Sequence, residues 1–269
     1  MPTCSTDSPS TALVTGASSG IGAALARCFA RGGHRLVLVA RREGRLRALA
    51  ATLRAEHGTR VDVLPADLAR HGAAAALAAS LRRRRRAVDV LVNNAGVLRQ
   101  GAFVGSGAVQ QQGMIDLNVA GLTAMLDAFV PAMVRRGRGR VLNVASISAF
   151  TPVPGLAVYA ASKAYVLSLT ESLAEELRGT GVTVTALCPG ITATEMLDHA
   201  AQGNARVAQL PRFVVGDVDE VAAEGYRACM AGEVVSVPGM LNQAATVAGR
   251  AAPKWLLRRI AGVLGRRMI

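Results

Sequence analysis

The sequence has few lysines and only four widely spaced cysteines, and both features exclude some classes of protein and site. Lys163 and Lys254 are its only lysines beside 29 arginines. This skew indicates coding bias, so the net charge of +13 is weak evidence for nucleic acid, and we expect no specific nucleic-acid partner. The four cysteines lie far apart and form no CxxC pair, which argues against a disulfide framework or a metal site and favours a reducing cytosol. A retained lysine stands out, because arginine does not imitate a compact ammonium beside a titrating group.

The chain also has little that resembles a targeting or membrane segment. Its first ten residues are polar and contain no signal-peptide core. The longest charge-free run, Val141–Ser162, contains Asn143, two prolines and several serines, which is typical of a strand and a loop rather than a membrane span. We therefore expect a soluble, cytoplasmic protein with a flexible N-terminus at residues 1–10.

Short apolar runs alternate with helical stretches such as Ile21–Arg31 and Arg45–His57. Most runs are rich in valine and leucine without strict alternation, which is typical of parallel strands buried on both faces. Strand and helix in alternation predict an α/β fold: a Rossmann-type, doubly wound parallel sheet in a single domain at residues 11–249. The predicted strands are Ala12–Thr15, Arg35–Val39, Val61–Leu64, Val88–Asn93, Arg140–Ala145, Val182–Cys188 and Val234–Val237.

The first predicted strand runs directly into a glycine-rich turn, Thr15–Gly22, that opens a helix. Glycines let the backbone turn sharply and approach a pyrophosphate, and the helix N-terminus offers free N–H groups and a positive dipole end. An ordinary tight turn is the alternative, but the position at the first strand–helix junction favours dinucleotide binding. The residues predicted to bind the cofactor here are Gly16, Ser18, Ser19, Gly20, Ile21 and Gly22.

The end of the second predicted strand favours NADP(H) over NAD(H). An acidic residue there would bind the adenosine ribose of NAD, but this chain has Ala40, Arg41 and Arg42. The alanine leaves room for a 2′-phosphate, and the two guanidinium groups supply the charge to hold it. The alternative is a pair of surface arginines in an arginine-rich chain.

Two further strand ends are expected at the same edge of the sheet, where open α/β sheets bind ligands. Asp67 and Leu68 follow the third strand, where a short acceptor can meet an adenine amino group. The segment Asn93–Gly96 follows the fourth, where asparagine braces a turn and small residues admit a cofactor. Either segment alone also fits a structural turn. The residues added to the predicted cofactor site are Asp67, Leu68, Asn94, Ala95 and Gly96.

Tyr159 and Lys163 are four residues apart in a stretch that can become helical, which places both side chains on one face. A tyrosine with its reference pKa of about 10 is a poor base at neutral pH, but a nearby ammonium and a positively charged nicotinamide both lower that pKa. Ser146, at the end of the fifth strand, is expected to donate to a carbonyl oxygen; Ser148 is its competitor, and spacing favours Ser146. Asn118 is expected to hold a water near Lys163.

Together these motifs resemble the short-chain dehydrogenase/reductase family in its one-domain form. The resemblance covers about Thr11–Gly239 and implies a seven-stranded sheet in the order 3-2-1-4-5-6-7. The local sequence Leu38–Arg42 is similar to that of the general, NADP-preferring bacterial branch of the family. Membership of this branch says little about the substrate. The motifs that carry the resemblance are Thr15–Gly22, Asp67, Asn93–Gly96, Asn118, Ser146, Tyr159, Lys163 and Pro189-Gly190.

The resemblance also implies roles for individual residues. The implied catalytic tetrad is Asn118, Ser146, Tyr159 and Lys163. In it the tyrosine gives or takes the proton, the lysine binds the ribose hydroxyls and lowers the tyrosine pKa, and the asparagine supports a water relay. The loop implied to contact the nicotinamide carboxamide carries Pro189, Gly190, Thr192 and Thr194, with Thr192 standing where valine or isoleucine is commoner. Helices carrying the asparagine and tyrosine commonly pair subunits, so a homodimer or homotetramer is expected.

Two segments near the C-terminus are less regular. Residues 195–213 lack clear periodicity and resemble the family's substrate lid, with a plain surface loop as the alternative. The tail at 250–269 carries six basic residues and no acid, with apolar residues at helical spacing. A helix packed on the core or on a neighbouring subunit, a basic amphipathic helix in weak contact with a membrane surface, and a frayed terminus all fit this tail.

These features predict an NADP(H)-dependent oxidoreductase that moves a hydride between nicotinamide and a small-molecule carbonyl or alcohol. One alternative is a dinucleotide sensor or scaffold without turnover, although such relatives usually lose the tyrosine or lysine that this chain retains. Another is a methyltransferase-like α/β enzyme, which shares the glycine-rich turn but does not explain Tyr159, Lys163 or the arginines after the second strand.

Overall fold

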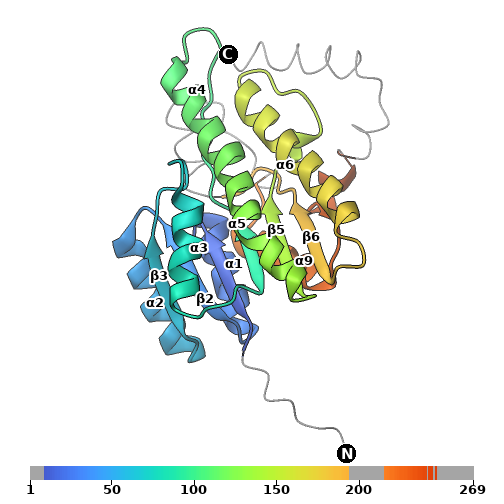
Figure 1. Ribbon diagram of the computed structural model, residues 1–269. Helices are drawn as coiled ribbons and strands as arrows, with labels where there is room; N and C mark the ends of the chain where they lie inside the picture. Colours follow the sequence, from blue (N-terminus) through green and yellow to red (C-terminus); the bar gives the residue numbers. More distant parts are fainter. Residues whose placement is uncertain (1–8, 194–214, 241, 245, 247–269) are drawn as a thin grey trace, which may run out of the picture.

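The computed structural model describes residues 9–193, 215–240, 242–244 and 246. They form one parallel sheet with helices on both faces (Figure 1). Thr194, the predicted lid at 195–213 and the predicted tail at 250–269 lie outside the described residues, as do residues 1–8 of the N-terminus.

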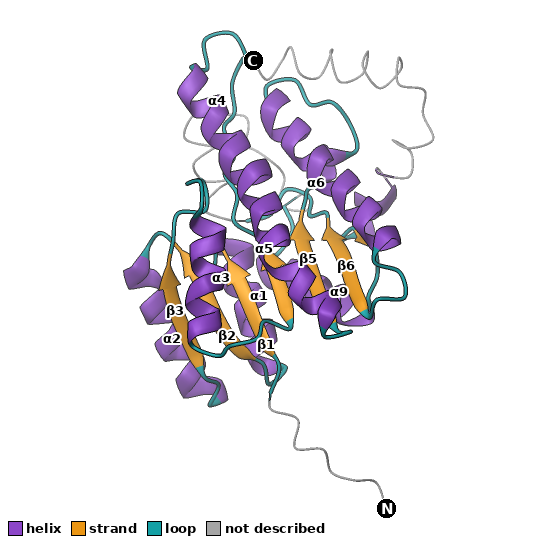
Figure 2. Ribbon diagram, in the orientation of Figure 1, coloured by secondary structure: helices purple, strands orange, loops and turns teal. Residues whose placement is uncertain are grey.

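A seven-stranded sheet forms the centre of the fold, in the order β3-β2-β1-β4-β5-β6-β7. This order confirms the one implied by the family resemblance. Neighbouring strands all pair in parallel, so their carboxyl ends meet at one edge, to which the strand arrows point in Figure 2. The strands are β1 (Thr11–Thr15), β2 (Arg35–Ala40), β3 (Val61–Pro65), β4 (Val90–Asn93), β5 (Gly139–Val144), β6 (Val182–Leu187) and β7 (Val235–Ser236).

Three observed strands are shorter than predicted: β6 ends one residue before Cys188, and β4 and β7 each lose two residues. The strand predicted from Val88 begins at Val90. Asp89, just before it, accepts a hydrogen bond from the Thr11 backbone through its carboxylate at 2.9 Å. The edge strand β7 keeps only Val235 and Ser236, which pair with Ala186 and Leu187 of β6. Its neighbour β6 lies second from this edge.

Helices bury the apolar residues of both sheet faces. On one face α1 (Gly20–Arg31), α2 (Glu43–His57) and α9 (Val218–Ala231) pack with Ala12 and Val14 of β1. On the other face α3 (Ala73–Arg83), α5 (Leu122–Arg135) and α6 (Ala157–Glu176) pack with Leu13. Successive β1 side chains enter opposite layers because strand side chains alternate. In Figure 2, α3 and α5 lie in front of the sheet and α1 lies behind it.

The helix α4 (Ala108–Ile115) continues into α5 through a π-helical turn, η1 (Asp116–Gly121). By length and composition alone, this continuous segment is apolar enough to cross a membrane. However, Met125, Phe129 and Met133 are buried in the layer that covers the sheet, which is typical of a core helix in a water-soluble fold. The π-helical turn is the more informative feature, because such turns often mark functional sites, and this one carries Asn118.

Candidate active site

The glycine-rich turn lies at the carboxyl end of β1 and leads into α1. Gly16 and Gly20 have φ angles of +65° and +53°, which a residue with a side chain adopts at a cost. A Cβ atom at Gly22 would lie 2.4 Å from both the Gly16 carbonyl oxygen and the Asn94 side-chain nitrogen. The turn therefore requires glycine at these positions, and it packs directly against the strand end that carries Asn94.

Thr15 joins the glycine turn to the segment after β4. Its hydroxyl oxygen accepts hydrogen bonds from the backbone nitrogens of Asn94 at 2.9 Å and Ala95 at 3.0 Å, and donates to the Val92 carbonyl at 3.1 Å. The Asn94 side chain donates to the Thr15 carbonyl at 2.9 Å. Two of the predicted cofactor segments thus form one rigid unit. Sequence reasoning missed the role of Thr15, although a threonine directly before the turn was a visible signal.

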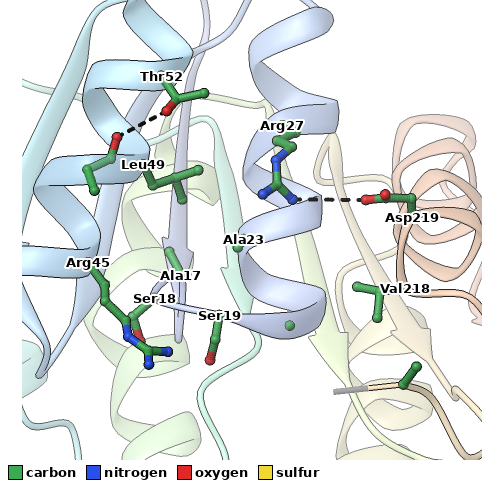
Figure 3. Close-up of a pocket in the computed structure, with 13 residues that line it drawn as sticks. Ala17, Ser18, Ser19, Ala23, Arg27, Arg45, Leu49, Thr52, Val218 and Asp219 are labelled. Carbon is green, nitrogen blue, oxygen red and sulfur yellow. Dashed lines mark hydrogen bonds and ion pairs between the residues drawn. The ribbon is translucent and has the colours of Figure 1, made fainter. Parts of the chain in front are cut away.

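Arg42 lies across the glycine turn. Its guanidinium donates to the Ser18 hydroxyl through Nε at 3.2 Å and Nη2 at 3.1 Å, and to the Ser19 hydroxyl at 2.7 Å. Arg41 is exposed next to it. Ser18 and Ser19 also line a cavity of about 590 Å³ between α1 and α2 (Figure 3). The structure therefore brings a predicted phosphate-binding arginine onto the predicted phosphate-binding turn.

Asp67 and Leu68 close the turn after β3. The Asp67 carboxylate accepts from the Ala69 backbone at 3.2 Å and lies 3.8 Å from the Arg70 guanidinium. The Leu68 side chain is buried in the core, and its carbonyl oxygen would lie 2.5 Å from a Cβ at Gly121. A Leu68 contact with a cofactor would thus be made by backbone rather than by side chain.

Tyr159 and Lys163 are both buried on one face of α6. The Lys163 ammonium lies 5.8 Å from the centre of the Tyr159 ring and donates to the Val144 carbonyl oxygen at 2.8 Å. Ser146 follows the end of β5, where its side chain lies close enough to Tyr159 to lower the pKa of the phenol, and its hydroxyl oxygen accepts from the Ser148 backbone at 3.1 Å. The predicted spacing therefore brings the phenol, the ammonium and the preferred serine together.

Burial dominates the ionisation of this pair. It raises the pKa of the Tyr159 phenol, and the hydrogen bond from Ser146 lowers it in part. Burial also lowers the pKa of Lys163 to about 8, against a smaller opposing effect of Cys188. Removal from water disfavours the phenolate and the ammonium alike, so the Tyr159 pKa is raised in the cofactor-free protein. The expected lowering of that pKa by Lys163 and a bound nicotinamide stays a prediction. At neutral pH the phenol is protonated.

Asn118 projects from the π-helical turn into the same region. Its side chain accepts from the Val97 backbone nitrogen at 2.9 Å, and it donates to the Val97 carbonyl at 2.9 Å and to the Ser162 hydroxyl at 3.2 Å. Gly96 lies between these groups: a Cβ there would lie 3.2 Å from Asn118 Oδ1 and 3.5 Å from Lys163 Nζ. Asn118 thus braces the loop after β4 against α6, and its expected water remains a prediction.

A chain of buried polar side chains ties the elements that carry the site. Asn93 of β4 donates to the Asn143 side chain of β5 at 3.0 Å, and Asn143 donates to the Thr170 hydroxyl of α6 at 2.9 Å. Thr170 donates in turn to the Val166 carbonyl at 2.7 Å. Asn143 precedes Val144, whose carbonyl binds Lys163. Sequence reasoning missed this chain, because its members are ordinary polar residues that only the strand register brings together.

The loop after β6 packs beside the serine turn. The Pro189 carbonyl accepts from the Ile147 backbone at 2.9 Å, and a Cβ at Gly190 would lie 2.6 Å from the Asn242 side chain. Thr192 forms a parallel bridge with Gly216, and its hydroxyl donates to the Gly190 carbonyl at 3.0 Å. Three of the four predicted nicotinamide-loop residues therefore lie at the same edge as Ser146, and Thr194 is the one outside the described residues.

The arrangement fits a dinucleotide. The first turn of α1 contains no acidic residue, and its N-cap residue Ser19 forms no side-chain capping bond, so this helix end is suited to an anion. The adjacent cavity and Arg42 supply room and positive charge. Within the described part of the chain, no group of three His, Cys, Asp or Glu side chains could hold a metal ion, and none of the described cysteines, Cys28, Cys188 and Cys229, forms a disulfide.

A doubly wound parallel sheet, a glycine turn at a helix N-terminus and a tyrosine–lysine pair at the carboxyl edge define a dinucleotide-dependent oxidoreductase. Residues 10–205 match the family model described as short chain dehydrogenase. The chain belongs to the short-chain dehydrogenase/reductase family.

Named relatives and solved structures agree with this assignment. Nodulation protein G of a Rhizobium species is 34% identical over 238 residues, which span 86% of this chain and 96% of that protein. A short-chain dehydrogenase from Sphingobium yanoikuyae in complex with NADPH is 39% identical, with a TM-score of 0.79 over 91% of this chain and 96% of that one. A family member from Burkholderia phymatum in complex with NAD is 28% identical, with a TM-score of 0.80 over 89% and 92% of the two chains.

Proposed function

We propose that this protein is an NADP(H)-dependent oxidoreductase that interconverts a carbonyl and an alcohol, with Tyr159 as the proton-transfer residue. The observation that carries the proposal is the buried Tyr159 phenol, which has both Ser146 and Lys163 as neighbours at the carboxyl edge of the sheet. The pair is buried, so proton transfer there would take place away from bulk water.

A bound nicotinamide dinucleotide supplies or accepts the hydride. In the reducing direction, the protonated Tyr159 phenol gives its proton to the carbonyl oxygen as that oxygen gains charge. The Ser146 hydroxyl donates its single proton to the same oxygen and stabilises the charge that develops there. The Lys163 ammonium, held by the Val144 carbonyl, adds positive charge beside that phenolate. Burial raises the Tyr159 pKa, so the resting phenol is in the form that reduction requires.

The preference for NADP(H) is supported by Arg42 on Ser18 and Ser19 and by the neighbouring Arg41. The glycine turn, Asp67 and Asn94–Gly96 would hold the rest of the dinucleotide, and Pro189–Thr194 would meet its nicotinamide end. The similar structure from Sphingobium yanoikuyae contains NADPH, which agrees with this preference, whereas the one from Burkholderia phymatum contains NAD. Because similar family members contain either cofactor, the proposed preference for NADP(H) rests on the arginines of this chain.

The proposal extends to a cytoplasmic homodimer or homotetramer. An apolar groove of about 400 Å³ runs between the helices that carry Asn118 and Tyr159, and Phe103 and Ile115 line it. Phe103 is 62% exposed, which is unusual for a phenylalanine and suits a covering subunit. Light scattering on the full-length protein should give the mass of two or four chains, and the mass of one chain would contradict this part.

Absorbance at the reduced-nicotinamide band tests the catalytic proposal. Wild-type protein is mixed with NADPH or NADH and a panel of ketones and aldehydes, and binding of both cofactors is measured on the same preparation. We expect tighter binding of NADPH and oxidation of NADPH by at least one carbonyl. Tight binding of NADPH without turnover on any carbonyl or in the reverse direction on alcohols would favour the alternative, a non-catalytic dinucleotide sensor.

A further inference from the structure

Besides Arg42, a second arginine faces the glycine turn, and it comes from α2. Arg45, Leu49 and Thr52 follow one another at helical spacing and line the same cavity as Ser18 and Ser19. In Figure 3 the Arg45 side chain extends from α2 toward the glycine turn. Sequence analysis assigned phosphate binding to Arg41 and Arg42 alone, because Arg45 lies inside a helix and only the packing of α2 beside α1 shows where it points.

The charges around the cavity are unevenly distributed. Arg45 and the serines that bind Arg42 lie at one end. Asp219 is the only acidic residue among the described residues that line the cavity, and it lies 4.0 Å from Arg27 at the opposite end. The end near the glycine turn therefore combines the Arg45 guanidinium with two serine hydroxyls that also bind Arg42, and the described residues that line it there contribute no carboxylate. This lining suits a doubly charged phosphate.

Arg47 shows that this placement is specific. It lies two residues further along α2, on a different face of the helix, and donates to the Glu43 carboxylate through Nε at 2.9 Å and Nη2 at 2.6 Å. Arg47 does not line the cavity. The two arginines thus carry the same charge, are both exposed on α2, and differ in what they face.

We propose that Arg45 is a specificity-determining residue that binds the 2′-phosphate of NADP(H) from the α2 side, opposite Arg42. The inference rests on the proposed cofactor preference and adds a residue outside the end of the second strand. A guanidinium can bind a phosphate through two parallel N–H donors. The ribose 2′-hydroxyl of NAD(H) offers no such charge, so Arg45 discriminates between the two cofactors.

Calorimetric titration of the full-length protein with nucleotides tests the proposed role of Arg45 and requires no turnover. The proteins compared are wild type, Arg45→Ala, Arg45→Lys and the matched control Arg47→Ala, each titrated with NADPH, NADH, adenosine 2′,5′-bisphosphate and 5′-AMP. Arg45→Ala should weaken NADPH and the bisphosphate roughly tenfold, as expected for one charged hydrogen-bonding group, and leave NADH and 5′-AMP unchanged. Arg45→Lys should lie between wild type and Arg45→Ala, and Arg47→Ala should match wild type.

The outcomes separate this inference from the proposed function. Equal weakening of NADPH by Arg45→Ala and Arg47→Ala would overturn the inference, because it would indicate a general loss of positive charge. Unchanged NADPH binding in Arg45→Ala, with wild type preferring NADPH, would overturn the role of Arg45 and leave the cofactor preference standing. Tighter binding of NADH than NADPH by wild type would overturn both. Thermal melts of all four proteins should coincide, since Arg45 and Arg47 are both exposed.

Discussion

The two ends of the site differ in their exposure to water. Tyr159 and Lys163 are only 8% and 6% exposed, and buried hydrogen bonds connect β4, β5 and α6 behind them. Arg41, Arg42 and Arg45 are all exposed at the other end. Burial strengthens electrostatic effects and makes an unpaired polar group costly, whereas water and salt screen the exposed arginines. In the proposed function, the buried end therefore carries out proton transfer, and the exposed end selects between the two cofactors.

The largest effect is expected from Lys163→Met at the buried end. Turnover should fall at least about a hundredfold, the scale of lost assistance to proton transfer. Stability should rise at neutral pH, because the native pKa of about 8 lies roughly 2.5 units below that of the unfolded chain, equivalent to about 3 kcal/mol. The lost hydrogen bond to the Val144 carbonyl offsets about 1 kcal/mol of this.

The pH dependence of unfolding checks the origin of that gain. Below pH 8 the lysine is charged in both the folded and unfolded protein, so the burial penalty is fully present. Between about pH 8 and 10.5 the folded protein binds fewer protons than the unfolded chain, so wild-type stability rises relative to Lys163→Met. Denaturant melts should show the advantage of the variant shrinking across this range. An advantage that grows or stays constant would show that the Lys163 ammonium is not destabilised by burial.

Thr170→Val tests the buried end of the site without changing the groups that react. It removes the acceptor of the buried Asn143 amide, which should cost about 1–3 kcal/mol of stability and lower turnover through a shift of α6. Thr170→Ser should restore both, because the hydroxyl remains. Thr185→Val is the matched control: its buried hydroxyl has no hydrogen-bond partner in the described structure. Equal losses in Thr170→Val and Thr185→Val, by melts and initial rates, would remove the positioning role.

The smallest effect is expected from Arg42→Ala at the exposed end. NADPH binding should weaken by up to about tenfold at low salt, and the effect should shrink between about 0.02 M and about 0.5 M NaCl because salt screens exposed charges. The loss of turnover in Thr170→Val should not change across the same range. An Arg42→Ala effect that is independent of salt would contradict the description of this end as exposed and screened.

Local patterns in the sequence predicted most of the fold. The valine- and leucine-rich runs, the glycine turn and the Tyr159–Lys163 spacing depend on neighbours in the chain, and the structure confirms the strand order. The Thr15–Asn94 and Asn143–Thr170 contacts join residues 79 and 27 positions apart, so they become visible only with the strand register and the packing of α6. Likewise, the direction of the Tyr159 pKa depends on burial, which the four-residue spacing does not show.

The most direct test of the central claim is Tyr159→Phe, which removes the phenolic hydroxyl and keeps the ring. Cofactor binding and single-turnover oxidation of NADPH by a carbonyl substrate are measured on the same samples as wild type. We expect NADPH to bind within about threefold of wild type, while the single-turnover rate falls by about a hundredfold or more, as general acid catalysis requires. Unchanged turnover with unchanged binding would show that another group moves the proton.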